Sequence, residues 1–331
     1  MDATTKYTAL HASPNGPSDS RPTAQQIIRD EGLQGKLSGK VIFITGCSSG
    51  IGIETARSLA TTGATLFLTA RDLNKAQVTL GDLVLRDNVH LLELDLNSLA
   101  SVRKCATVFL AKSSTLNILI NNAGVMVPPE GRTADGFETQ FGTNHLAHFL
   151  LVQLFKDTLL ASATEEMSSR VIMVSSSGHR ASEVQLDNYN FAGCYDPFPA
   201  YGQSKTAMIW AANEIDRRYG SQGLHAFSLH PGNIASGLQK HVPDELKQQW
   251  AQIPGLESSA KSTEQGASTT VWAATAKCLE GRGGLFLEDC QIIGPLASDS
   301  GPLDPGYAPW VYDRSKAEKL YDLSMKLVAF E

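Results

Sequence analysis

The sequence is poor in cysteine, has no cluster of basic residues and lacks any long apolar run. Its 331 residues include five cysteines, which form no Cys-x-x-Cys pair and no cysteine and histidine spacing suited to zinc. We therefore expect reduced cysteines and no metal site. The formal net charge is -6 and the lysines and arginines are scattered, which argues against a nucleic-acid-binding surface.

Segments that would direct the chain to a membrane are also missing. The N-terminus has no apolar core of a signal peptide, and no stretch of about 18 uncharged apolar residues occurs. The expectation is a cytoplasmic protein that binds a small molecule. Residues 1–36 contain Pro14, Pro17 and Pro22 among many small polar residues, which favours a flexible N-terminal extension with at most a short helix over 23–32.

From residue 37 onward, apolar runs alternate strictly with helical segments. The pattern predicts strands over 41–45, 64–70, 89–95, 116–123, 170–176, 225–231 and 284–290. It predicts helices over 50–61, 73–86, 98–111, 136–160 and 201–219. This alternation implies one α/β domain over 37–331, a Rossmann-type doubly wound parallel sheet of about seven strands with helices on both faces. Irregular segments at about 180–200 and 235–264 are expected on the substrate side.

A glycine-rich turn follows the first predicted strand directly and opens the first helix. It reads Thr45-Gly-Cys-Ser-Ser-Gly-Ile-Gly52, so its glycines have the spacing G-x-x-x-G-x-G. Glycines let the backbone approach a pyrophosphate, and a helix N-terminus offers free N–H groups. A plain strand-to-helix turn is the alternative, but the placement favours a dinucleotide site.

The end of the second predicted strand bears on the choice of cofactor. An NAD site would typically place an acidic residue there, whereas this sequence has Ala70 and then Arg71. A guanidinium can pair with a 2'-phosphate, so the sequence favours NADP(H). The absence of a basic residue at Ser49 weakens that preference.

Tyr201 and Lys205 are four residues apart, on one face of a predicted helix. A cation near a phenol favours the phenolate and lowers its pKa, which prepares it for proton transfer. The predicted strand before this helix ends in Ser175, Ser176 and Ser177, and a hydroxyl there could polarise a carbonyl. Asn144, within a predicted long helix, could hold a bridging water or could be purely structural.

Taken together and in order, these segments resemble the short-chain dehydrogenase/reductase family over about residues 37–328. The matching segments are TGCSSGIG at 45–52, NNAG at 121–124, Asn144, VSS at 174–176, Tyr201 with Lys205, and Pro231-Gly232. The resemblance is strongest to the branch of retinol dehydrogenases and WW-domain oxidoreductases, through residues 141–146, Ser176 with His179, and residues 230–233.

The resemblance implies a catalytic role for each of four residues. Tyr201 would be the general acid/base, and Lys205 would lower its pKa and bond the nicotinamide ribose. Ser176 would orient the carbonyl, and Asn144 would hold a water for proton relay. The implied cofactor-binding set comprises Gly46, Ser48, Ser49, Ile51 and Gly52 at the pyrophosphate, Arg71 at the 2'-phosphate, Asp95 and Leu96 at the adenine, Asn122 and Ala123 near the adenosine ribose, Tyr201 and Lys205, and Pro231, Gly232, Ile234 and Ser236 in the turn at the carboxamide.

The expected reaction is hydride transfer between NADP(H) and a carbonyl or secondary alcohol of a medium-sized apolar molecule, such as a secondary metabolite. Family members often form dimers or tetramers, so a homodimer or homotetramer is an expectation. Phe191, Tyr195, Phe198, Leu238 and Trp250 suggest a roomy aromatic pocket, with core packing as the alternative. The lack of an N-terminal membrane anchor argues against a membrane-dissolved retinoid.

Two other functions compete with this prediction. A relative of the fold could bind the cofactor yet act as an isomerase, a cyclase or a non-redox scaffold. A hydrolase could use Ser175–Ser177 with His179, but no G-x-S-x-G motif surrounds these serines. His179 is more simply a polar residue at the rim of the crevice, where it could touch substrate.

Overall fold

The structure, a computed structural model, describes residues 3–330, and these form an eight-stranded sheet in the order β3-β2-β1-β4-β5-β6-β7-β8. All neighbouring strands are parallel except the pair β7 and β8. The strands are β1 Val41–Ile44, β2 Thr65–Ala70, β3 Val89–Glu93, β4 Ile118–Asn121, β5 Ser169–Val174, β6 Leu224–His230, β7 Leu285–Glu288 and β8 Gln291–Ile292. The order reverses between β1 and β4, and ligands of such sheets bind at this reversal.

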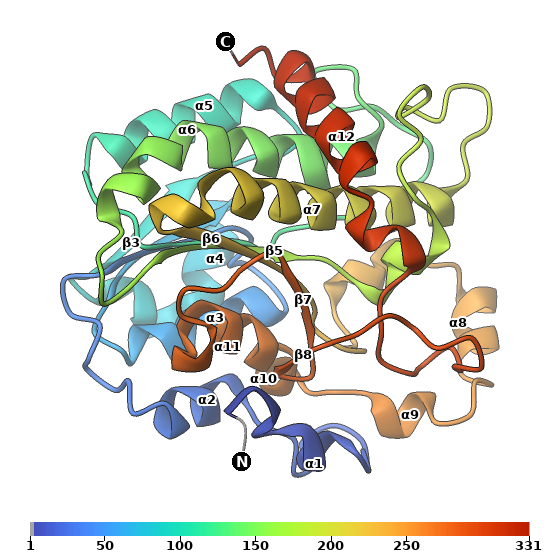
Figure 1. Ribbon diagram of the computed structural model, residues 1–331, viewed down its shortest axis with the longest axis horizontal. Helices are drawn as coiled ribbons and strands as arrows, with labels where there is room; N and C mark the ends of the chain where they lie inside the picture. The colour runs from blue at the N-terminus through green and yellow to red at the C-terminus, as the bar shows by residue number, and fades with distance from the viewer. Residues whose placement is uncertain (1–2, 331) are drawn as a thin grey trace.

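The helices that follow the strands lie on both faces of the sheet (Figure 1). The α-helices are α1 Thr8–His11, α2 Ala24–Asp30, α3 Ile51–Ala60, α4 Leu73–Leu80, α5 Leu99–Leu110, α6 Ala147–Ser162, α7 Pro197–Tyr219, α8 Asp244–Trp250, α9 Leu256–Ser259, α10 Thr263–Gly266, α11 Ser268–Thr275 and α12 Arg314–Leu327. Short 3-10 helices are η1 Ala3–Thr5, η2 Gly81–Leu85, η4 Ser177–Ala181, η5 Gly220–Gln222, η6 Gly237–His241, η7 Lys277–Leu279 and η8 Pro309–Tyr312, and η3 Phe141–Leu146 is a π-helix.

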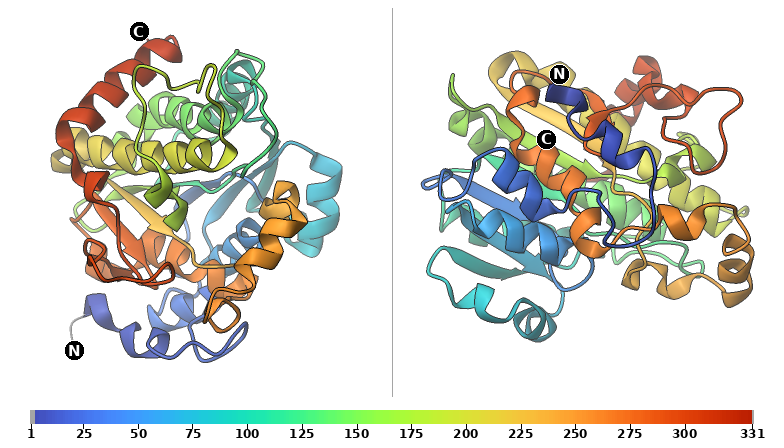
Figure 2. Two further views of the ribbon diagram at one scale, coloured as in Figure 1. Left: turned by 90° about the vertical axis from the view of Figure 1, so that its right-hand side faces the viewer. Right: turned by 90° about the horizontal axis from the view of Figure 1, so that it is seen from below.

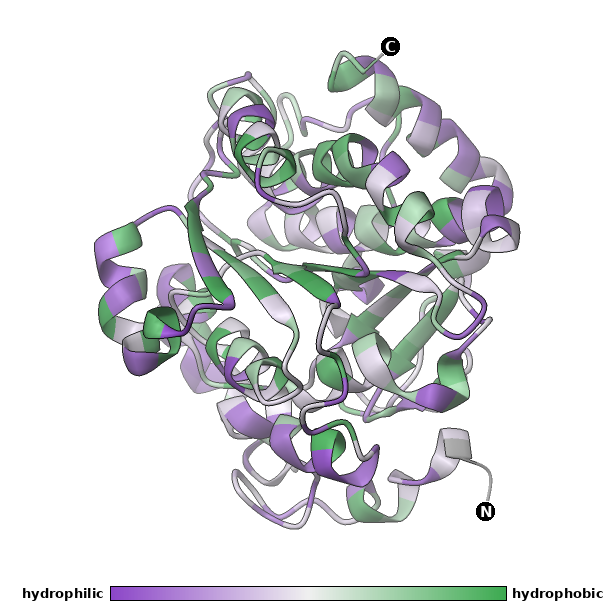
Figure 3. Cartoon of the chain, turned by 90° about the vertical axis from the view of Figure 1, so that its left-hand side faces the viewer, coloured by the Kyte–Doolittle hydropathy of each residue, from purple (hydrophilic) through white to green (hydrophobic). Residues whose placement is uncertain are grey.

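The apolar core consists of one layer on each face of the sheet. One layer packs α5, α6, α7 and α12 on the sheet, with Phe43, Phe109 and Phe155 in edge-to-face or tilted contact. The other packs α2, α3, α4 and α11, with Trp272 fully buried. Every residue of β1, β4 and β5 is buried, as expected for strands covered on both sides. Figure 3 shows hydrophobic strands inside and hydrophilic colour on the helices around them.

The predicted α/β sheet is confirmed, with one strand more than about seven. The additional strand, β8, is only two residues long, too short to give a sequence pattern. The predicted helix over 136–160 begins later, as the π-helix η3 at Phe141, and continues into α6. Helix α7 begins earlier than predicted because Asp196 accepts the N–H of Phe198 as N-cap and Pro197 suits the first turn.

The segment before β1 differs from the predicted flexible extension. Residues 3–36 pack on the domain, with Tyr7, Ile27 and Ile28 buried. The predicted short helix is present as α2, which is capped by Thr23. Figure 2 shows this segment lying across the face that carries α10 and α11. The composition suggested a flexible extension, but a few buried apolar residues and the buried Arg21 attach the segment to the domain.

The two segments expected on the substrate side contain short helices joined by loops. Residues 182–196 form an irregular loop, and residues 235–264 contain η6, α8 and α9 and the start of α10. Both segments follow the carboxyl ends of strands, β5 and β6 respectively. Within residues 3–330, no helix is both long and apolar enough to span a membrane.

Candidate active site

The glycine-rich turn between β1 and α3 can exist only with glycine at its key positions. Gly46 and Gly50 have φ of +76° and +61°. A Cβ at Gly46 would lie 2.8 Å from the Cα of Ala123, and one at Gly52 would lie 2.2 Å from the carbonyl oxygen of Gly46. The turn therefore brings the backbone of β1 and that of the segment after β4 into direct contact, with the N-terminus of α3 facing the same edge of the sheet.

Thr45 joins this turn to the segment after β4. Its hydroxyl accepts the backbone N–H groups of Asn122 (2.9 Å) and Ala123 (3.0 Å), and it lies 3.0 Å from His148 Nε2. His148 Nδ1 donates to the carbonyl of Asn144 at 2.8 Å, so Nε2 is the acceptor for the threonine hydroxyl. Burial lowers the pKa of His148 to about 4, which keeps this ring neutral. Sequence reasoning missed both Thr45 and His148, because neither residue alone indicates a hydrogen-bond hub.

Asn122 supplies a polar atom at the same edge of the sheet. Its Nδ2 donates to the carbonyls of Thr45 (2.8 Å) and Gly46 (3.3 Å). Its Oδ1 is buried and has no hydrogen-bond partner within the described residues. A buried acceptor without a partner is costly in a finished fold, so this atom is suited to a ligand hydroxyl.

Tyr201, in the second turn of α7, faces the serine that follows β5. The phenol of Tyr201 interacts with the side chain of Ser176, and this interaction acts to lower the pKa of the phenol. Gly178 packs against the ring, since a Cβ there would lie 2.7 Å from Tyr201 Cε1. The neighbouring Ser175 is different, because its buried hydroxyl donates to the carbonyl of Lys205 at 2.9 Å. Of the three candidate serines, Ser176 is therefore the one that the structure pairs with the tyrosine.

Lys205 lies one turn beyond Tyr201 and is buried. Its Nζ donates to the carbonyl of Val174 at 2.9 Å and lies 5.6 Å from the centre of the Tyr201 ring. Burial lowers the pKa of Lys205 to about 7. Burial also raises the pKa of Tyr201 to about 12, against an opposing effect of Ser176. The sequence predicted a tyrosine made acidic by the lysine, whereas in this structure desolvation dominates and the phenol keeps its proton at neutral pH.

Asn144 lies in the π-helix η3, beside Lys205 and Gly124. Its Oδ1 accepts the N–H of Val125 at 2.8 Å, and its Nδ2 donates to the Val125 carbonyl and to Ser204 Oγ, each at 2.9 Å. The side-chain amide thus clamps the segment after β4 to α7. Both ends of the amide are engaged, which is the positioning contact that the sequence left open beside a water-binding role.

The remaining predicted cofactor residues surround the same edge of the sheet. Arg71 is exposed just after β2, and Asp72 caps α4. Asp95 and Leu96 follow β3, where Leu96 is buried. The turn after β6, Pro231–Ser236, approaches the glycine-rich turn, because a Cβ at Gly50 would lie 3.7 Å from the Cβ of Ser236.

His179 does not lie at the rim of the crevice, where the sequence suggested it. It is fully buried, and burial lowers its pKa to about 4. Its Nδ1 lies 2.6 Å from the carbonyl of Ser176, and its Nε2 accepts the N–H of Ala308 at 3.1 Å. His179 therefore ties the Ser176 loop to the C-terminal segment and is unavailable as a hydrolytic base.

A hollow of about 350 Å³ shares two lining residues with the apolar cluster that contains Tyr201. Its lining includes Val127, Tyr195, Phe198 and His241. Val127 and Phe198 also belong to the apolar cluster around Tyr201, where Phe198 meets Trp250 edge to face at 6.1 Å. Of the five aromatic or apolar residues expected at the pocket, Phe198 and Trp250 thus pack in the cluster with Tyr201 and Tyr195 lines the hollow, whereas Phe191 is buried in the turn that it forms.

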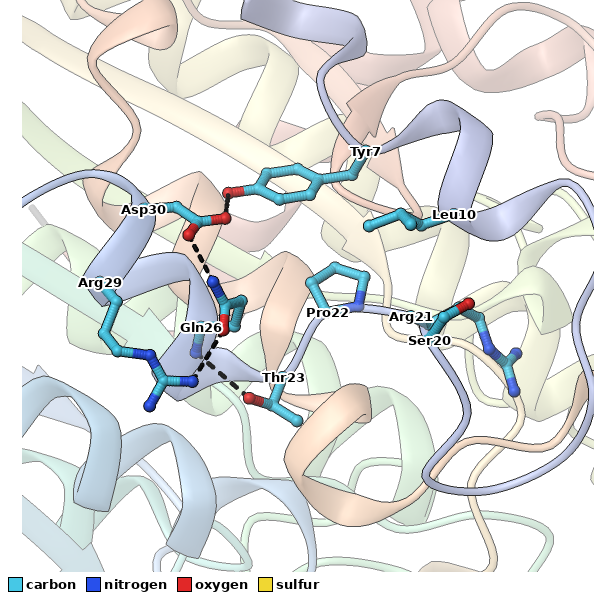
Figure 4. Close-up of a pocket in the computed structure, with 9 residues that line it drawn as sticks. All are labelled: Tyr7, Leu10, Ser20, Arg21, Pro22, Thr23, Gln26, Arg29 and Asp30. Atoms are coloured by element: carbon cyan, nitrogen blue, oxygen red, sulfur yellow. Dashed lines mark hydrogen bonds between the residues drawn. The ribbon is translucent and has the colours of Figure 1, made fainter.

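A second hollow, of about 320 Å³, lies between Tyr7 and α2 (Figure 4). Its polar side chains bond to one another: Tyr7 Oη donates to Asp30 Oδ2 at 3.0 Å, and Arg29 donates to Gln26 Oε1 at 2.7 Å. This hollow belongs to the attachment of the N-terminal segment and lies apart from Tyr201.

The contact between Gly178 and Tyr201 gives a first prediction. In Gly178→Ala the new methyl group must displace the ring of Tyr201 or the hydroxyl of Ser176, which would lie 3.3 Å away. We expect kcat to fall by about 10- to 100-fold, because a misplacement near 1 Å at reacting atoms has that cost. Dinucleotide affinity, measured by fluorescence titration, should stay unchanged. Gly294→Ala, where a Cβ would meet open space, is the matched control, and equal kcat in the two variants would refute the contact.

Comparisons with known proteins agree with this geometry. The family model described as short chain dehydrogenase matches residues 40–247. The short-chain dehydrogenase/reductase prx1 of Penicillium roqueforti is 50% identical over 323 residues, which cover 98% of this chain and 95% of that protein. Human retinol dehydrogenase 11 is 36% identical over 260 residues, 78% of this chain and 79% of that protein.

A solved structure shares both sequence and fold with this chain. The Pseudomonas aeruginosa RhlG/NADP active-site complex is 26% identical, with a TM-score of 0.62 over 77% of this chain and 96% of that chain. The resemblance to retinol dehydrogenases predicted from the sequence is confirmed. The chain belongs to the short-chain dehydrogenase/reductase family, whose members act as oxidoreductases on carbonyl and alcohol groups.

Proposed function

We propose that this protein is an NADP(H)-dependent reductase that transfers hydride to the carbonyl group of a medium-sized apolar molecule. The observation that carries the proposal is that Ser176 and Tyr201 lie together against Gly178, with the ammonium group of Lys205 one turn away on the same helix as Tyr201. Tyr201 would supply the proton, and the glycine-rich turn would bind the pyrophosphate of the dinucleotide.

The residues at the carboxyl edge of the sheet fit a dinucleotide. Gly46, Gly50 and Gly52 leave the backbone of the turn bare for a pyrophosphate, and the partnerless Oδ1 of Asn122 can accept a ribose hydroxyl. Ser48, Ser49 and Ile51 complete the turn, Ala123 contacts it at Gly46, and Asp95 and Leu96, which follow β3, would lie toward the adenine. When bound, the nicotinamide supplies the hydride.

The protein's own contribution is to hold the carbonyl group and to move a proton. The Ser176 hydroxyl would donate to the carbonyl oxygen, and Tyr201 would pass its phenolic proton to that oxygen as the carbon accepts hydride. Lys205 would stabilise the phenolate that remains and hold the nicotinamide ribose. Since burial raises the pKa of Tyr201 to about 12 in the free protein, the phenol is protonated at neutral pH and can act as the proton donor that carbonyl reduction needs.

The apolar hollow supports the class of substrate. Its volume of about 350 Å³ is near the lower end of the usual range for small-molecule sites. Tyr195 and Phe198 present ring surface, while Glu130 and His241 lie at its border. Such a lining suits an aromatic or terpenoid-sized carbonyl compound.

A spectrophotometric assay tests the proposal directly. Purified protein should oxidise NADPH, followed at 340 nm, when given apolar ketones and aldehydes of this size. No oxidation with any carbonyl compound, together with tight NADPH binding, would favour a non-redox member of the family and overturn the proposal.

Arg71 gives a second prediction, on the choice between NADPH and NADH. Its exposed guanidinium after β2 would pair with the 2'-phosphate, so Arg71→Ala should lower kcat/KM for NADPH by about 10- to 100-fold and leave the value for NADH unchanged. Arg86→Ala, an exposed arginine before β3, is the matched control. An equal loss with both cofactors would show that Arg71 does not read the 2'-phosphate. The NADP named for the RhlG structure agrees with the preference.

A further inference from the structure

One buried lysine holds the turn after β6, residues 231–236, in place. Lys261, of which 4% is exposed, donates its backbone N–H to the carbonyl of Asn233 at 2.8 Å, and Ile234 forms a parallel bridge with it. Its Nζ donates to Asp289 Oδ1 at 2.5 Å and to the Pro231 carbonyl at 3.4 Å. The lysine therefore contacts the turn through both its backbone and its charge.

The turn 231–236 packs directly against the side chain of Lys261. Gly232 has φ of +105°, and a Cβ there would lie 2.7 Å from Lys261 Cδ. Asp289, the partner of the lysine, is itself held at a positive φ of 54°. Such angles are uncommon for non-glycine residues, although aspartate adopts them more readily than most. The position of the turn is thus set by Lys261 and Asp289.

The segment that carries Lys261 is in turn held by the N-terminal segment. Arg21, of which 4% is exposed, donates to the carbonyls of Ser259 (2.7 Å) and Ala260 (2.5 Å), the two residues before Lys261. Its Nε donates to Asp19 Oδ1 at 2.9 Å. A planar guanidinium with several fixed donors suits such a set of carbonyls, which a lysine could not serve together.

Further hydrogen bonds surround this contact on both sides. The backbone N–H of Gly16 donates to the carbonyl of Ser258 at 2.7 Å. Beyond Lys261, Gln265 Oε1 accepts the N–H of Ser18 at 2.9 Å, and its Nε2 donates to the carbonyl of Arg21 at 3.1 Å. The stretch 16–21 therefore brackets Lys261, and Figure 2 shows the N-terminal segment beside α9 and α10.

The far side of the turn meets the proposed cofactor site. Ile234 and Ile51 both pack on Gly266, since a Cβ there would lie 2.6 Å from Ile234 Cγ1 and 2.9 Å from Ile51 Cγ2. Ser236 lies against Gly50, as described above. A shift of the turn would therefore change the space beside the glycine-rich turn and the N-terminus of α3.

We propose that the N-terminal stretch 16–21 contributes to cofactor binding. In it, Arg21 is a positioning residue that fixes the turn 231–236 through Lys261. This inference rests on the proposed function, because it assumes that the turn borders a bound nicotinamide nucleotide. Arg21 touches no reacting atom, and its effect is on the geometry of the turn.

The experiment compares the full-length variants Arg21→Met and Arg29→Met with the wild type. Arg29 is exposed in the same segment and bonds to Gln26, so its loss is the matched control. Two readouts are measured well below the melting temperature: the Kd for NADPH by fluorescence without any carbonyl compound, and amide hydrogen exchange of residues 232–236 in the free protein.

The proposal expects Arg21→Met to raise the Kd about tenfold and to speed exchange in the turn, because the charged hydrogen bonds of Arg21 to the carbonyls of Ser259 and Ala260 are lost. Arg29→Met should stay within about twofold of the wild type in both readouts. Lys261→Met provides a second variant should Arg21→Met fold poorly, and it should raise the Kd at least as much.

Unchanged Kd and unchanged exchange in Arg21→Met, with only a lower melting temperature, would show a purely structural role and overturn the inference. A wild type that binds no nucleotide would overturn the proposed function instead. In that case the exchange readout still decides whether Arg21 controls the turn.

Discussion

Replacing Tyr201 by phenylalanine should lower kcat by about 10³- to 10⁴-fold and leave the Kd for NADPH within about twofold of the wild type. The ring of Tyr201 packs on Gly178 and is nearly buried, so phenylalanine fills the same space. What disappears is the hydroxyl that interacts with Ser176 and would pass its proton to the carbonyl oxygen. Rates at 340 nm and fluorescence titration measure the two quantities.

Tyr219→Phe is the matched control for this variant. Tyr219 ends the same helix, α7, and its hydroxyl lies 3.3 Å from that of Tyr321, far from Ser176. Its kcat should equal that of the wild type. If Tyr201→Phe retained more than about a tenth of the wild-type kcat, another group would have to supply the proton and the mechanism would fail.

Lys205→Met should lower kcat by about 100-fold or more and should also change how stability depends on pH. The unfolded chain holds the lysine proton up to about pH 10.5, whereas burial lowers the pKa in the folded protein to about 7. Between these values the unfolded state binds more protons, so the free energy of unfolding of the wild type rises with pH. Relative to Lys205→Met, the wild type should gain roughly 3 kcal/mol between pH 7 and pH 9.5.

Urea unfolding of both proteins at the two pH values measures this difference. Lys75→Met, a change at a lysine in α4, should track the wild type at both. A difference between wild type and Lys205→Met that does not change with pH would show that Lys205 keeps an ordinary pKa in the fold. The buried ammonium would then have to be stabilised by contacts other than that with the Val174 carbonyl.

The sequence was informative about the sheet because its strands are almost wholly apolar. The run at 41–44 is buried at every residue, and the seven longest strands were all predicted near their observed positions. The pair of Tyr201 and Lys205 could also be predicted from the sequence, since a four-residue spacing on a helix places two side chains on one face whatever packs around them.

Properties that depend on burial could not be predicted in the same way. The raised pKa of Tyr201 and the lowered pKa of Lys205 come from desolvation, which a sequence pattern does not specify. His179 looked like a residue at the rim, but the C-terminal segment covers it through Ala308, 129 residues away. A signal for Gly178 did exist, because a glycine two residues after Ser176 leaves space for a ring.

The N-terminal segment illustrates a second limit. Prolines and small polar residues favour a flexible leader, yet the single buried Arg21 finds its acceptors more than 200 residues away in the chain. Contacts of such separation leave no local periodicity. The packing of residues 3–36 could therefore be found only from the structure.

The central claim is that Tyr201 protonates a carbonyl oxygen while the carbon accepts hydride from NADPH. The most direct test uses NADPH carrying deuterium at C4 in the transferred position, with a carbonyl compound that the 340 nm assay identifies. The account predicts deuterium on the carbinol carbon of the isolated alcohol with the wild type, and almost none with Tyr201→Phe under the same conditions. Alcohol formed without deuterium, or equal labelling with both proteins, would contradict it.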